Sequence, residues 1–160
     1  MRPLLLGLAV LALALAGCTG GTGTLVVQAS DPADDIADFS SLTVQVTKAT
    51  AHSSDGSEKD VHLTISSVDV VKLQGGNLTT LAQQDVAAGN YSWIRLEVSS
   101  ASGTLKAGGS VTVDVPSDSL KLNGPFEVKT GSTTHLRVDL HVVKTGNDKY
   151  ELRPVIGSVG

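Results

Sequence analysis

Hydrophobic and polar residues alternate along most of the chain after residue 23. The alternation recurs in short runs at residues 25–27, 42–46, 61–65, 68–73, 94–98, 111–115 and 136–142. The clearest run places Leu136, Val138, Leu140 and Val142 on one face, with polar residues between them. A period of two is typical of β-strands with one buried face, and no long stretch shows the period of a helix.

Turn-forming residues separate these runs. Glycine, asparagine, aspartate or proline pairs occur at residues 55–56, 75–77, 89–90, 108–109, 123–125 and 146–148. Many short strands at turn-separated intervals predict an all-β fold, and we expect an antiparallel β-sandwich of about seven to nine strands with Greek-key connections. A short helical turn is expected over residues 34–39. No linker divides the region 24–160, so it is predicted to be one domain.

The first 17 residues have the organisation of a secretory signal peptide. Arg2 precedes an apolar run from Leu4 to Ala16, which is shorter than the roughly 20 residues that a membrane-spanning helix needs. The sequence Leu15-Ala16-Gly17-Cys18 resembles the bacterial lipobox. We therefore expect cleavage after residue 17. Cys18 would carry a thioether-linked diacylglyceryl group and fatty acyl chains such as palmitate. The alternative is an ordinary signal peptide with a cysteine nearby.

Residues 18–23 would form a short Gly/Thr tether between this lipid anchor and the domain. The domain would lie outside the cytoplasm at the cell membrane or the outer membrane, facing the periplasm or the exterior. Cys18 is the only cysteine, so no disulfide is expected. With 12 basic and 16 acidic residues the net charge is −4, and no basic stripe indicates a nucleic-acid partner.

An aspartate cluster provides one candidate ion site. Asp31, Asp34, Asp35 and Asp38 fall within eight residues, and calcium binds several carboxylate oxygens. Their spacing is not that of an EF-hand loop, and Asp34 could equally cap the helical turn. Calcium is thus the one cofactor that the sequence suggests. The alternative explanation is that the aspartates form ordinary turn structure.

The histidines and possible catalytic residues give weaker patterns. His135 and His141 share a strand face but are about 20 Å apart at strand rise, too far to share a metal. His52 and His62 flank a turn without an evident third ligand. No local signature of a hydrolase, metalloprotease or phosphate-binding loop is present, so we expect no enzymatic activity.

Two aromatic residues are candidates for a ligand platform. Trp93 alternates with Ile94 and Leu96, so it is expected on the outer face, beside Tyr91, where a ring could stack against a sugar. The alternative is that residues 89–91 form a tyrosine corner, with the Tyr91 hydroxyl bonded to nearby backbone. We favour the corner. Asn77 and Asn90 begin N-x-[ST] sequons, which would be glycosylation sites in an archaeal host.

Several segments follow one another in a recognisable order. They are residues 25–27 with the aspartates of 31–35, then 42–46, 68–73, Gly89-Asn90-Tyr91 with Ile94-Arg95-Leu96, 115–122 and 150–156. Together they resemble a family known as domain of unknown function 4382, found in secreted proteins and lipoproteins of bacteria and archaea. The family often has D-A-P where this chain has Asp31-Pro32-Ala33. The resemblance implies a prealbumin-like β-sandwich, but it assigns no activity, since the family itself is uncharacterised.

The sequence therefore predicts a non-enzymatic, lipid-anchored domain that binds an envelope protein or glycan, or contributes to envelope structure. The alternatives are a carbohydrate- or calcium-binding module and, third, a hydrolase.

Overall fold

The computed structural model describes residues 20–30 and 36–160. Within them the chain is all-β, as expected, with short 3₁₀ turns in place of α-helices. The strands are β1 (Thr22–Ser30), β2 (Phe39–Ser53), β3 (Glu58–Val61), β4 (Ser67–Asp69), β5 (Thr79–Ala87), β6 (Gly89–Leu105), β7 (Ser110–Asp114), β8 (Ser119–Val128), β9 (Thr133–Gly146) and β10 (Lys149–Val159). The 3₁₀ turns are η1 (Ile36–Asp38), η2 (Val70–Leu73) and η3 (Pro116–Asp118).

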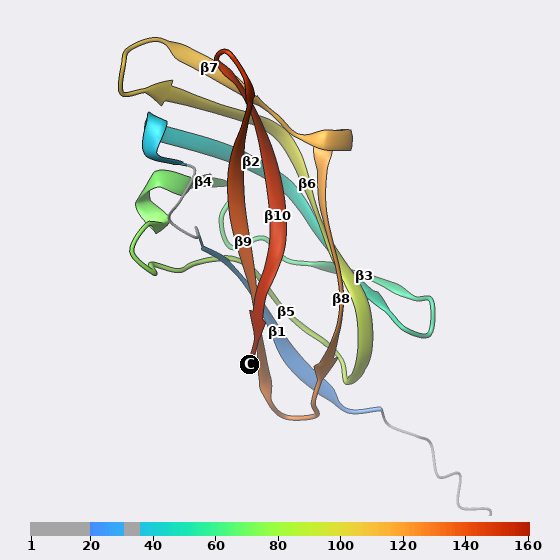
Figure 1. Cartoon of the computed structure of the whole chain (residues 1–160). Coiled ribbons are helices and arrows are strands. Elements are labelled where there is room, and N and C mark those ends of the chain that lie inside the picture. The colour runs from blue at the N-terminus through green and yellow to red at the C-terminus, as the bar shows by residue number, and fades with distance from the viewer. Residues whose placement is uncertain (1–19, 31–35) are drawn as a thin grey trace, which may run out of the picture.

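Ten described strands belong to one connected sheet, which exceeds the seven to nine expected. The strand order is β3-β2-β6-β7-β10-β9-β1-β5, with β4 added to β2 and β8 added to β6. The sheet curves around a common interior (Figure 1). Most neighbours are antiparallel, but β1 pairs with β9, and β10 with β7, in parallel. The expectation of a purely antiparallel arrangement is therefore wrong at these two pairs.

The two longest strands form the frame on which the candidate site is built. β6 has 17 residues and pairs with β2 along most of its length. On its other side, its first half pairs with β8 and its second half with β7. β2 and β8 lie on either side of the first half of β6 (Figure 1). An outer-face residue in that half is therefore positioned between these two strands.

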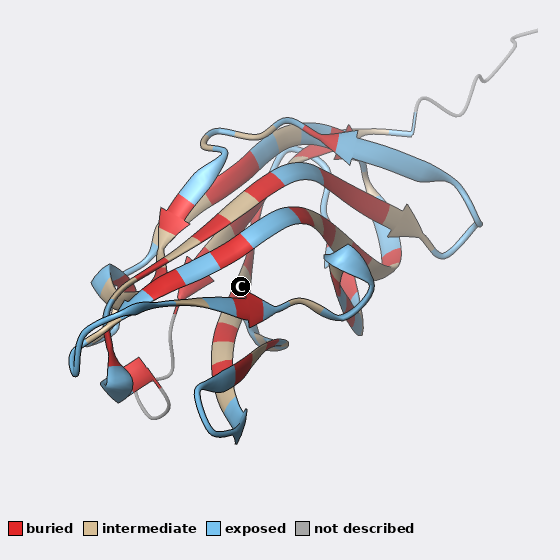
Figure 2. Cartoon of the chain, turned by 90° about the horizontal axis from the view of Figure 1, so that it is seen from above, coloured by how far each residue is buried: buried red, intermediate tan, exposed pale blue. Residues whose placement is uncertain are grey.

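The alternating residues form the core as predicted. Ile94 and Leu96 are fully buried on β6, and Leu136, Val138, Leu140 and Val142 are at most 1% exposed. Figure 2 shows the resulting stripes of buried and exposed residues along the strands. The helical turn expected over 34–39 appears as η1, at residues 36–38, while residues 34 and 35 lie outside the described part.

Two apolar runs differ from their expected strands. Residues 62–66 form no strand, and Leu63 makes only an isolated bridge to Ala82. Residues 68–73 divide into β4 and η2. The cause is Asp69, whose side chain accepts hydrogen bonds from the Val71 N–H (3.2 Å) and the Leu42 N–H (3.1 Å) and so caps η2.

None of the helical turns in the described ranges is long and apolar enough to span a membrane. Residues 1–19, with the expected signal peptide, Cys18 and the first part of the tether, lie outside the described residues.

Candidate functional site

Tyr91 forms the predicted corner. Its hydroxyl donates a 2.8 Å hydrogen bond to the carbonyl oxygen of Ala87, and its ring stacks on Phe126 with 5.2 Å between centroids. The residue is only 3% exposed, and this burial raises the pKa of its phenol, with a smaller contribution from the Asp55 charge. Tyr91 is therefore a structural residue, and the interpretation of its ring as part of a surface platform is wrong.

Trp93 lies on the outer face of β6, half-buried, as the alternation predicts. A register shift between Tyr91 and Trp93 separates the two rings. Trp93 pairs directly with His52 of β2. The two rings are nearly parallel, with 4.5 Å between centroids and 17° between planes. The Nδ1 atom of His52 is buried and has no hydrogen-bond partner in the described residues.

Two cations also contact the Trp93 ring. The guanidinium carbon of Arg95 lies 4.8 Å from the ring centroid, and the Lys121 ammonium lies 4.4 Å from it. Because β2 and β8 flank β6 on opposite sides, His52 and Lys121 approach the ring from opposite strands. Neighbouring side chains thus cover the Trp93 ring, so it is not an open surface on which a sugar could stack. The ring instead holds two positive side chains in place.

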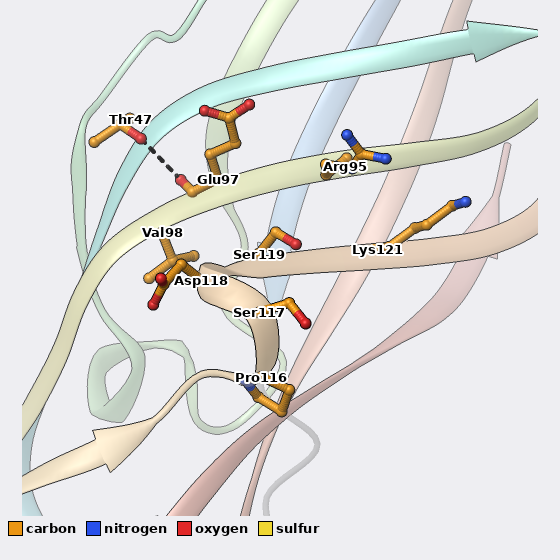
Figure 3. Close-up of a pocket in the computed structure, with 9 residues that line it drawn as sticks. All are labelled: Thr47, Arg95, Glu97, Val98, Pro116, Ser117, Asp118, Ser119 and Lys121. Atoms are coloured by element: carbon orange, nitrogen blue, oxygen red, sulfur yellow. Dashed lines mark hydrogen bonds between the residues drawn. The ribbon is translucent and has the colours of Figure 1, made fainter.

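A hollow of about 660 Å³ opens next to these cations. It is lined by Thr47, Arg95, Glu97, Val98, Pro116, Ser117, Asp118, Ser119 and Lys121 (Figure 3). The floor comes from the outer faces of β6 and β8, and η3 forms a wall. The Thr47 hydroxyl is fixed at the rim by a 3.3 Å hydrogen bond to the Glu97 carbonyl oxygen. The lining is rich in hydroxyl and charged groups, so the hollow suits a polar ligand.

The wall of the hollow contains one residue with strained backbone. Ser117 has a φ of 59°, in the left-handed region that residues other than glycine, asparagine and aspartate rarely adopt. Asp118 has a φ of 49°, in the same region, which aspartate tolerates. Pro116 begins η3 and Leu120, which is buried, fixes the start of β8. Strained conformations of this kind are retained where the surrounding structure enforces them, often at binding sites.

Charge is distributed unevenly around the hollow. Arg95 and Lys121 face each other in the β6–β8 register, and the ion pairs found in the described ranges include neither of them. The carboxylates of Glu97 and Asp118 lie toward the other end (Figure 3). The hollow therefore has a cationic end and an acidic end.

Asp38, from the aspartate cluster, is not among the residues that line this hollow and contacts β9 and β10. Its Oδ2 accepts hydrogen bonds from the Tyr150 hydroxyl (2.8 Å) and from the Lys144 ammonium (3.3 Å). These two contacts, the tyrosine first, hold the pKa of the Asp38 carboxyl below its ordinary value of 3.8. A calcium ion on Asp38 would have to compete with the Lys144 charge. Asp31, Asp34 and Asp35 lie outside the described residues.

The histidines that the sequence offers as metal ligands are not brought together in the described residues. In residues 20–30 and 36–160, no three His, Cys, Asp or Glu side chains are arranged to hold a metal ion. His52 lies opposite Glu58, whereas His62 follows the end of β3. His135 and His141 remain on β9.

Both sequons are on exposed residues. The side-chain amide of Asn77 donates to the carbonyl oxygens of Gln74 (2.9 Å) and Lys72 (3.3 Å). That nitrogen is the atom a glycan would modify, so glycosylation at Asn77 would require these bonds to break. Asn90 is the second residue of β6, and its carbonyl oxygen accepts a hydrogen bond from the Ser54 N–H at 2.8 Å.

Sequence reasoning identified Trp93 but missed the hollow's other lining residues Arg95, Lys121, Ser117 and Ser119. The alternation places Arg95 on the outer face, yet nothing in the sequence indicates that residue 121 is its partner in the sheet. That pairing depends on the long-range register of β6 with β8. One local signal exists, because Val115-Pro116-Ser117-Asp118 interrupts two alternating runs with turn formers.

Comparison with known proteins gives one match. The sequence model of a family described as Domain of unknown function (DUF4382) matches residues 22–154, nearly all of the described chain. Neither a curated protein sequence nor a solved structure matches significantly.

Proposed function

We propose that this chain, which belongs to the DUF4382 family, is a lipid-anchored extracytoplasmic binding domain whose ligand occupies the hollow beside η3. It binds without catalysing a reaction, and its ligand is part of, or enters, the cell envelope. The proposal also takes the curved sheet to be a prealbumin-like β-sandwich, a finer description than the all-β fold.

The observation that carries the binding function is the hollow itself. The hollow is open to solvent, and its volume of about 660 Å³ is within the size range of small-molecule sites. Two of its lining side chains have defined positions, because Arg95 and Lys121 lie over the Trp93 ring, which stacks on His52. A binding site that is organised before the ligand arrives loses less conformational entropy on binding.

The lipobox supports the anchored location. Gly21 and Thr22, at the start of β1, are held at one end of the domain by two backbone hydrogen bonds. The Gly21 carbonyl accepts one from the Ala88 N–H (2.7 Å), and the Thr22 carbonyl accepts one from the Gly131 N–H (2.8 Å). Along β6 the hollow begins about 20–26 Å from that end, at a rise of about 3.3 Å per residue. An anchor at Cys18 would leave the hollow open to the surroundings.

The anchor is tested by replacing its cysteine. Cys18→Ala in the full chain should abolish incorporation of labelled fatty acid and release the protein from the membrane, or leave its signal peptide uncut. The control is Thr19→Ala, which keeps the thiol and should be labelled like the wild type. A Cys18→Ala protein that matures normally and stays on the membrane would refute the anchor.

Binding in the hollow is tested separately, by photo-crosslinking in the native envelope. A photoreactive amino acid is placed at Thr47, on the rim of the hollow, or at Gln83, which is exposed on β5. We expect a discrete adduct from position 47 that is absent from position 83. Equal labelling at both positions, or none at 47, would contradict the proposal.

A further inference from the structure

We infer that the cationic end of the hollow is an oxyanion subsite formed by Arg95 and Lys121, and that the ligand is an anionic glycan carrying a carboxylate or phosphate group. The inference deepens the proposed function and depends on the hollow being the binding site.

The first argument is the juxtaposition of two like charges. Arg95 and Lys121 are direct cross-strand partners, an arrangement that destabilises a sheet when both residues have the same charge. No carboxylate in residues 20–30 or 36–160 forms an ion pair with either of them. An oxyanion bound between the two side chains would remove the repulsion and add charge-assisted hydrogen bonds.

The second argument is that both cations are held in position. Each lies over the Trp93 ring, at 4.8 Å for the Arg95 guanidinium carbon and 4.4 Å for the Lys121 nitrogen. Trp93 is in turn stacked on His52 at 4.5 Å. A guanidinium with five N–H donors and an ammonium with three can then bind the same carboxylate or phosphate.

The remaining lining indicates that the rest of the ligand carries hydroxyl groups. Ser117 and Ser119 add hydroxyls to the lining, between Asp118 and Lys121 in the view of Figure 3. Glu97 and Asp118, at the acidic end, accept hydrogen bonds from hydroxyl donors and repel a second anionic group. A sugar with one anionic group satisfies both ends, whereas a densely charged polyanion does not.

The position of the subsite favours a glycan over a membrane lipid. Gly89, at the start of β6, lies at the end of the domain where β1 begins, and Arg95 is about 20 Å further along the strand. With the chain anchored through Cys18, lipid headgroups would lie at the tether end, away from the two cations.

The test uses the full chain purified in mild detergent. Trp93 is the only tryptophan and contacts both cations, so its fluorescence reports on this subsite. The chain is titrated with glucuronate, glucose 6-phosphate and glucose. We expect saturable changes with at least one of the anionic sugars, weakened by salt, and none with glucose at the same concentrations. A response to glucose equal to that of the anionic sugars, or no response to either anion, would overturn the inference.

Matched variants connect the response to the two cations. Lys121→Gln should raise the half-saturation concentration about tenfold, equivalent to about 1.4 kcal/mol, because a charge-assisted hydrogen bond to the anion is lost. Glu97→Gln should lower it, because a nearby carboxylate is removed. Lys129→Gln, the same charge change at an exposed residue beyond β8, should leave it unchanged. Equal effects of Lys121→Gln and Lys129→Gln would contradict the subsite.

The inference and the proposed function fail differently. If the Thr47 adduct forms but neither anionic sugar binds, the hollow is a binding site and the oxyanion subsite is wrong. If the adduct is also absent, both are wrong.

Discussion

The Tyr91 hydroxyl donates a 2.8 Å hydrogen bond to the carbonyl oxygen of Ala87, and this bond joins the last residue of β5 to the start of β6. The Tyr91 ring is buried against Phe126, so the orientation of β6 at its origin is fixed from inside the domain. The outer-face residues of β6, beginning with Trp93, depend on that orientation.

Tyr91→Phe should therefore lower the free energy of unfolding by about 1 kcal/mol. The ring and its stacking remain, and only the hydroxyl is lost. Ala87 is exposed, so water can hydrate the freed carbonyl and limit the cost. Urea unfolding of the purified chain measures the difference. A loss above 3 kcal/mol would show that the hydroxyl does more than make this one bond.

Leu96→Ala should be much more costly, by about 2–5 kcal/mol, because Leu96 is fully buried and its removal leaves a cavity. Arg95→Ala, the neighbouring change on the outer face, should alter the free energy of unfolding by no more than about 0.5 kcal/mol. The same urea titration compares the two variants. The reverse order of costs would place the wrong face of β6 in the core.

The sequence allowed much of the fold to be predicted, because alternation is a local property. Leu136 to Val142 and Ile94 to Val98 show it without interruption, and both runs are strands with the expected buried face. The prediction from alternation was wrong at residues 70–73. There an apolar run predicts a strand, but the Asp69 side chain caps a 3₁₀ turn. That cap also depends on Leu42, which is distant in the sequence.

The candidate site was harder to predict, for the same reason. Trp93 was placed on the outer face by its neighbours in the sequence. Its contacts with His52 and Lys121, in contrast, arise from pairing among β2, β6 and β8. A hollow between paired strands has no local sequence signature. The turn formers at residues 116–118 coincide with its wall, but they do not by themselves indicate a binding site.

Ser117→Gly should stabilise the chain by about 1 kcal/mol, because it relieves a left-handed conformation with φ of 59°. Ser119→Gly is the matched control. Its φ of −153° is extended, so glycine there gains no relief and should cost about 0.5–1 kcal/mol. Thermal unfolding measures both. If the two glycine variants shift stability in the same direction, the backbone of η3 is not strained in solution.

The Asp38 contacts predict a pH dependence. Since they hold the folded-state pKa below 3.8, their contribution to stability is present above that value and is lost as the pH falls below it. Asp38→Asn should lower stability at pH 7, and the difference from wild type should shrink in acid. Asp114→Asn, at an exposed residue of β7, is the control. A difference that stays constant from pH 7 to pH 2 would exclude ionisation of Asp38 as its source.

The coupling between Arg95 and Lys121 should change sign when an anion binds. A double-mutant cycle with Arg95→Gln, Lys121→Gln and the double variant isolates the interaction of the pair from each residue's contact with Trp93. Without ligand we expect an unfavourable coupling of about 0.2–1 kcal/mol, as for like charges paired across strands, and it should decrease in high salt.

In saturating glucuronate or glucose 6-phosphate, the same cycle should give a favourable coupling, because each cation then strengthens the other's hold on a shared oxyanion. Unfolding in urea, followed by circular dichroism so that changes at Trp93 do not interfere, provides the four free energies under each condition. Glucose should leave the unfavourable coupling unchanged. A favourable coupling in the absence of any anion would mean that the pair is already neutralised within the chain, and the reason for an oxyanion to bind there would be lost.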